Sequence, residues 1–106
     1  MNFMTMLDIQ PSATLRRQDV VAMNTNMILS NSGLMKKDLA KAMGLSPQSM
    51  ASRLQSKADW TIDETCAAAD FFGVPLMALL DENLTPAKAM EYIKTAVPIM
   101  GTTVNW

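Results

Sequence analysis

The sequence of 106 residues has no histidine and a single cysteine, Cys66. Without histidine, the chain lacks the side chain most often used for proton transfer near neutral pH and for zinc binding. One cysteine excludes an internal disulfide and a site built from several thiolates. Cys66 lies among small residues, which indicates a buried, inert thiol rather than a nucleophile. Because the carboxylates are scattered over expected helix starts and loops, we expect no enzyme, no cofactor and no metal site.

Long hydrophobic runs are also missing. No apolar stretch approaches the roughly 20 residues that a membrane span needs, and residues 1–8 lack the features of a signal peptide. These absences favour a cytoplasmic protein of one domain without membrane contact. Aromatic residues are few, at 6 %, whereas methionine is abundant, with 11 residues. We interpret most methionines as gap-filling core residues of a helical protein, the alternative being a methionine-lined binding surface.

The net charge of −1 is unevenly distributed along the chain. Residues 33–57 have a net charge of +4, and residues 58–91 have a net charge of −6. Because the local field rather than the total charge attracts phosphate groups, the basic part is a candidate surface for nucleic acid. An ordinary solvated surface is the alternative interpretation.

Two short helices joined by a tight turn are predicted at 36–55. Leu39, Ala40 and Met43 share one face of the first helix, which ends at Gly44, where a positive φ angle is expected. This pattern organises the rest of the chain.

The second helix of the pair begins at Ser46 and Pro47. The Ser46 hydroxyl can accept a free backbone N–H, and Pro47 suits the first helical position because it has no N–H to satisfy. Met50, Ala51 and Leu54 mark the expected inner face. The outer face carries amides, hydroxyls and one guanidinium, which suit base edges in the major groove of DNA. These outer residues are Gln48, Ser49, Ser52, Arg53 and Gln55.

The pair resembles the helix-turn-helix of the Cro/repressor-type (XRE) family of DNA-binding proteins. The resemblance is carried by Leu39-Ala40, Met43-Gly44, Leu45-Ser46 and Met50, and continues through Trp60-Thr61-Ile62-Asp63-Glu64, Ala69 and Phe72-Gly73-Val74-Pro75-Leu76 to Leu79-Leu80. It covers residues 20–82. The resemblance implies an all-α fold, a five-helix lambda-repressor-like bundle, here with an extra C-terminal helix and short, β-prone terminal segments. It also implies a transcription regulator of phage or mobile-element type, a repressor by preference, that binds a specific double-stranded DNA sequence.

In such proteins the second helix of the pair enters the major groove. By this resemblance, Gln48 and Ser52 read base edges, and Ser49 and Arg53 contact bases or nearby phosphates. The residues expected to hold the DNA backbone are Lys36, Lys37, Ser46, Gln55 and Lys57. Family members often bind a pseudo-palindromic operator as homodimers, so DNA and a second copy are the expected partners, with no small-molecule ligand. Met35 departs from the family, since relatives carry a capping Thr there.

Three parts are expected: an N-terminal arm at 1–18, the helix-turn-helix domain at 19–84, and a C-terminal helix and tail at 85–106. Residues 1–11 are compatible with a short strand or with an unordered arm. Residues 99–106 are β-prone and are expected to pair with the N-terminal segment or with another subunit; a free tail is the alternative.

The first helix is expected to begin near Ala13, with a break between residues 17 and 19, and to end at Gly33. Its inner face is interrupted by the polar pair at 24–25. The fourth helix is predicted to begin at a capping box of Thr61 and Glu64.

Trp60 is expected to be a packing anchor rather than a base-stacking group. Gly73 should end the fourth helix, and Pro75 should open the fifth. Thr85 and Pro86 open a sixth helix, whose expected inward residues are Ala87, Met90 and Ile93, with Tyr92 as a further candidate.

The apolar C-terminal part is the expected dimer contact, dispensable for folding of the five-helix unit. A different class of function remains open: a protein-interaction module, such as an antitoxin that binds a toxin through the acidic half or the tail.

Overall fold

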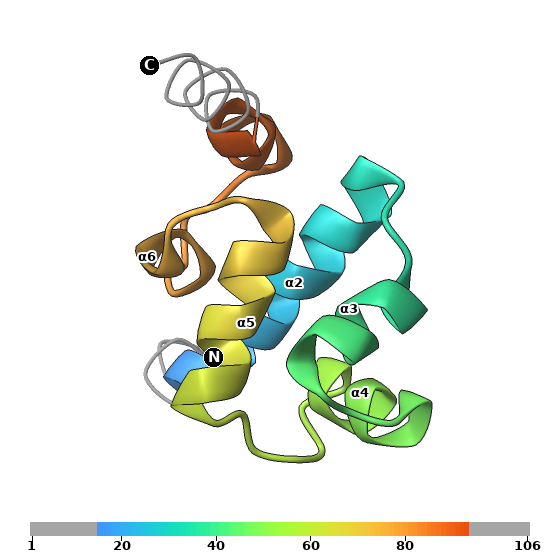
Figure 1. Ribbon diagram of the computed structural model, residues 1–106. Coiled ribbons are helices and arrows are strands. Elements are labelled where there is room, and N and C mark those ends of the chain that lie inside the picture. The colour runs from blue at the N-terminus through green and yellow to red at the C-terminus, as the bar shows by residue number, and fades with distance from the viewer. Residues whose placement is uncertain (1–14, 94–106) are drawn as a thin grey trace, which may run out of the picture.

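The computed structural model describes residues 15–93 of the chain (Figure 1). Its helices are α2 (Arg17–Ser32), α3 (Lys36–Met43), α4 (Pro47–Leu54), α5 (Ile62–Phe72) and α6 (Leu76–Leu79), and a last helix begins at Pro86 and is described to residue 93. The described part contains no strand, so it is all-α, as the sequence predicts. None of the described helices is long and apolar enough to cross a membrane. The strands expected near the two termini lie outside the described residues.

Helix α2 contacts α4, α5 and α6, and α3 packs against both α4 and α5. In Figure 1, the pair α3 and α4 lies on one side of α5, and α6 lies on the other. Ile28 of α2, Leu39 of α3 and Leu79 of α6 are all fully buried. These helices therefore share one hydrophobic core, against which Leu45 and Trp60 also pack. The prediction that Trp60 is a packing anchor is confirmed.

The helix ends follow the local chemistry of the sequence. Helices α2, α3 and α5 end at Gly33, Gly44 and Gly73, each with a φ angle between 72° and 77°. The Ser46 hydroxyl accepts the Ser49 N–H at 3.1 Å. These helix ends are as predicted.

The predicted capping box at the start of α5 is also confirmed. Glu64 N–H donates to Thr61 Oγ1, and Thr61 N–H donates to Glu64 Oε1, both at 3.0 Å. Met35 precedes α3 without a side-chain cap, as expected from its thioether.

Helix α2 departs from the expectation at its start. Leu15 and Arg16 are not helical, so the described helix begins at Arg17, and no break occurs between residues 17 and 19. Asp19 does not interrupt the helix, because its carboxylate accepts the Arg16 N–H at 3.2 Å and satisfies the helix start. The hydrogen bond from the Arg16 side chain also holds the pKa of Asp19 below its usual value.

The polar pair in the middle of α2 is buried. Asn24 is 3 % exposed, and its Nδ2 atom donates to the Leu79 and Asp81 carbonyls, each at 2.9 Å. These contacts tie α2 to the end of α6. Thr25 is fully buried, and its hydroxyl has no hydrogen-bond partner among the described residues.

The last helix belongs to the same core. Lys88 N–H donates to Thr85 Oγ1 at 3.2 Å, which confirms the predicted cap. Ala89 is fully buried, whereas Ala87 is exposed, so the expected inward face was wrong at Ala87. Met90, Tyr92 and Ile93 pack against the core as well. The last helix thus shares the core of the bundle, and the expectation that the bundle folds without it stays a prediction.

Candidate nucleic-acid interface

Helices α3 and α4 with the turn between them form one unit, residues 36–54, which we call the α3–α4 unit. Its buried side is apolar: Leu39, Met50 and Leu54 are at most 7 % exposed. Gly44 permits the chain to leave α3 and enter the turn, and Leu45 anchors that turn on the core. Among the residues discussed as contacts to DNA, the exposed members of the unit are Lys36, Lys37, Ser46 and Gln48, whereas Ser49, Ser52 and Arg53 are half-buried. Gln55 and Lys57 are exposed in the segment that follows the unit.

The outer face of α4 differs from the expected face at Ala51. Ala51 is exposed, together with Pro47, Gln48 and Gln55, whereas it was expected inside. Gln48, Ala51 and Gln55 lie on one stripe of the helix because each is about one turn from the next, and Pro47 lies one turn before Ala51. Ser52 is half-buried at the edge of the stripe. Gln48 and Gln55 thus keep the exposed placement that a base or phosphate contact requires, with Ala51 between them.

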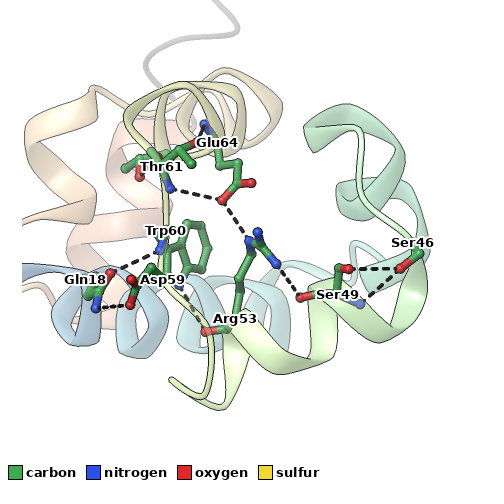
Figure 2. A network of polar contacts seen from close by, with 9 residues as sticks. Gln18, Ser46, Ser49, Arg53, Asp59, Trp60, Thr61 and Glu64 are labelled. Carbon is green, nitrogen blue, oxygen red and sulfur yellow. Dashed lines mark hydrogen bonds and ion pairs between the residues drawn. The ribbon is translucent and has the colours of Figure 1, made fainter.

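Ser46 and Ser49 serve mainly the helix start. The Ser46 hydroxyl accepts the Ser49 N–H and donates to Ser49 Oγ, both at 3.1 Å (Figure 2). Ser46 is exposed and Ser49 is half-buried. Their hydroxyls already have partners within the protein, which leaves them less free for DNA than Gln48.

Arg53 does not belong to the outer face, which corrects the sequence-based prediction. Its side chain is 18 % exposed and turns toward α5, where Nε donates to Glu64 Oε1 at 2.8 Å (Figure 2). Nη1 donates to the Ser49 carbonyl at 3.2 Å. The guanidinium is therefore directed toward α5, and its Nε and Nη1 atoms already have partners within the protein.

The carboxylate that receives Arg53 is Glu64, whose side chain is 12 % exposed. Burial alone would raise the pKa of Glu64, but the hydrogen bonds from Arg53 and from the Thr61 N–H, with the positive charge of Arg53, lower it below the usual value. The same carboxylate thus completes the cap of α5 and fixes the side chain of α4. This dual role depends on the ionised form.

Two further side chains hold the C-terminal end of α4. The Trp60 indole N–H donates to the Arg53 carbonyl at 3.0 Å, and Asn26 Nδ2 donates to the Leu54 carbonyl at 2.9 Å. Gln18 completes the network, since its side-chain Oε1 accepts the backbone N–H of Trp60 and its Nε2 donates to Asp59 Oδ1 (Figure 2). Last-turn carbonyls of a helix have no partner within the helix, so these donors fix its position. The roles of Gln18 and Asn26 were not predicted from the sequence, because their partners lie far along the chain.

The basic residues fall into two groups. Four exposed lysines form no ion pair or hydrogen bond through their side chains within the described part of the chain: Lys36, Lys37, Lys41 and Lys57. The described basic residues with carboxylate partners are Arg16, Arg17, Arg53 and Lys88. The unpaired positive charge is therefore concentrated on the α3–α4 unit and the loop that follows it.

The structure places Lys36 and Lys37 beside the first turn of α4, because both line one cavity together with Pro47, Met50 and Ala51. Lys57 follows α4 in the loop beyond its C-terminal end. The expected backbone contacts thus flank α4 in the fold. Comparisons of the chain with protein-family models, with curated proteins and with solved structures gave no significant match.

Proposed function

We propose that this protein binds a specific sequence of double-stranded DNA through the α3–α4 unit and regulates transcription, as a repressor of phage or mobile-element type. The observation that carries this proposal is the exposed stripe of α4, with Gln48 and Gln55, flanked by lysines that have no ion-pair partner within residues 15–93. Amides can donate to and accept from base edges, and unpaired lysines supply the affinity for phosphates. The family resemblance supports the same function.

A rigid reading helix supports sequence specificity, because base contacts require fixed geometry. Three contacts hold α4 from the protein side: the Arg53–Glu64 ion pair, the Trp60 indole and the Asn26 amide. All three lie at or near the C-terminal end of the helix, and none of them involves the side chain of Gln48 near its N-terminal end. They leave Gln48 free while fixing the helix that carries it.

The first experiment measures binding of the protein to duplex DNA over a range of salt concentrations, followed by selection of bound sequences from a random pool. We expect affinity to fall as salt rises, since counterions are released from the DNA, and we expect one sequence to be enriched. Lys37→Gln and Lys57→Gln should each reduce the salt slope by about 1. Lys88→Gln is the matched control, because it removes one charge from a lysine near Asp81, outside the α3–α4 unit. Salt-independent binding, or equal slopes for all variants, contradicts the proposal.

A homodimer is part of the proposal, because one recognition helix covers only a few base pairs and two copies set paired half-sites. Residues 97–106 include Val97, Ile99, Met100, Val104 and Trp106 and are the candidate contact. Since residues 86–93 pack on the core, the deletion must spare them and remove only 94–106. Sedimentation at micromolar concentration should give a dimer for the full chain and a monomer for the deletion variant. A monomeric full chain, or a dimeric variant, refutes this contact.

Binding of a partner protein, as an antitoxin would bind a toxin, is the second candidate. An apolar cavity of about 300 Å³ favours it. The cavity lies between α2, α5 and α6, outside the α3–α4 unit, and Ile62 at its edge is 76 % exposed. Retention on random duplex DNA in low salt separates the two candidates: a DNA-binding protein is retained and elutes as salt rises, whereas a protein-binding module passes through.

A further inference from the structure

The cavity beside the first turn of α4 is small and has two chemical parts. We call this cavity the notch. Its volume is about 260 Å³, and it is lined by Lys36, Lys37, Pro47, Met50 and Ala51. Pro47, Met50 and Ala51 supply an apolar floor on α4. The two lysines on α3 supply positive charge without a carboxylate partner among the described residues. The notch therefore suits an apolar group that is close to a negative charge.

The volume lies below the range of roughly 300–1,000 Å³ of sites for drug-sized ligands, so a protruding group of a larger partner fits it better. On duplex DNA, the apolar group of the major groove is the 5-methyl group of thymine, and phosphates lie near every base. Ala51 lies in the exposed stripe between Gln48 and Gln55, on the part of α4 that the proposed function turns toward the bases. The stripe has two apolar members, Pro47 at the start of the helix and Ala51 at its middle, and the Ala51 methyl group can contact a thymine methyl group without displacing either neighbouring amide.

We propose that the notch receives the methyl edge of one thymine in each half-site, with Ala51 as the contacting side chain and Lys36 and Lys37 facing the neighbouring phosphates. The inference rests on the proposed function and adds a specificity-determining residue to it. Ala51 thus supplies a preference for thymine that Gln48 and Gln55 do not, because the two amides act through hydrogen bonds.

The test uses the full chain and the duplex enriched by selection, in which each thymine is replaced by uracil, one position at a time. Uracil has the same hydrogen-bonding groups and lacks only the methyl group. We expect a loss of affinity of about fourfold at one position per half-site, the value of one buried methyl group. In the Ala51→Gly variant, the thymine and uracil duplexes should bind equally at that position.

Ala42→Gly is the matched control, because Ala42 is exposed on α3, outside the notch, and the change has a similar cost in helix propensity. It should keep the fourfold preference. If Ala51→Gly does not fold by circular dichroism, Ala51→Ser replaces it, and its hydroxyl should also remove the preference for the methyl group. If a sequence is enriched but all of its uracil duplexes bind as tightly as the thymine duplex, the inference is overturned and the proposed function is not. Failure of the selection to enrich any sequence overturns the inference together with the proposed function.

Discussion

Arg53 of α4 and Glu64 in the first turn of α5 form a largely buried ion pair, with 2.8 Å between Nε and Oε1. The pair joins the candidate reading helix to the capping box of the next helix. It also explains why an arginine next to the outer face of α4 is turned away from solvent: Glu64 offers a fixed, partly desolvated acceptor, and the Ser49 carbonyl offers a second.

Replacing Arg53 with methionine should lower the free energy of unfolding by about 1–3 kcal/mol, because the largely buried carboxylate of Glu64 loses its charged partner. Denaturant unfolding measures this loss. Gln48→Ala is the control, since an exposed substitution should change stability by less than about 0.5 kcal/mol. The double variant Arg53→Met with Glu64→Gln should lose less than the sum of the single losses. Additive losses would mean that the two side chains do not interact.

The stability of the protein should depend on pH through Glu64. Its pKa in the folded protein lies below the ordinary value of 4.5, so the unfolded chain takes up the proton first as pH falls. The stabilisation is therefore complete above about pH 5 and is lost as pH falls through the folded pKa. The difference in unfolding free energy between the parent and Glu64→Gln should shrink as pH is lowered from about 6 to 3. A constant difference over this range would exclude Glu64 as the titrating group.

Gly44 tests the turn between α3 and α4. Its φ angle is 72°, and a Cβ atom placed there would meet no residue other than its two chain neighbours within 4 Å, so the cost of substitution comes from backbone strain. Gly44→Val should lower the free energy of unfolding by at least ~1 kcal/mol, and Gly44→Asn by clearly less, because asparagine tolerates the left-handed region. Thermal melts compare the two. Equal melting temperatures for both variants would argue against a strained backbone at this position.

Thr25 offers a stabilising substitution. Its hydroxyl is buried in α2 without a hydrogen-bond partner among the described residues. Thr25→Val keeps the shape and removes the unpaired polar group, so the free energy of unfolding should rise by about 1 kcal/mol. Calorimetry should show a higher melting temperature. A lower one would indicate that the hydroxyl is satisfied in solution.

The helix ends could be predicted because each depends on a few neighbouring residues. Gly44 follows an apolar helical face directly, Ser46 is three residues from the N–H that it accepts, and Thr61 is three residues from Glu64. Turn and cap chemistry of this kind acts over a single turn of chain. The apolar face of α3 follows from the helical period of its few residues.

Side chains at the border of a helix face were beyond prediction. Arg53 and Ala51 both lie beside the inner residues of α4, and the helical period alone does not decide which of them turns inward. Arg53 turns inward because Glu64, 11 residues later in the chain, accepts a hydrogen bond from its side chain. The hydrogen bond from Asn26 of α2 to the Leu54 carbonyl of α4 likewise depends on tertiary packing.

The measurement that most directly tests DNA reading by α4 compares the parent protein and Gln48→Ala on two duplexes, the selected sequence and a scrambled one. Gln48 is exposed, so the variant should fold as the parent does. We expect Gln48→Ala to bind the selected duplex more weakly by about 1–3 kcal/mol and the scrambled duplex equally well, because only a base contact is lost. Equal affinities of parent and variant for the selected duplex would contradict the assignment of α4 as the reading helix.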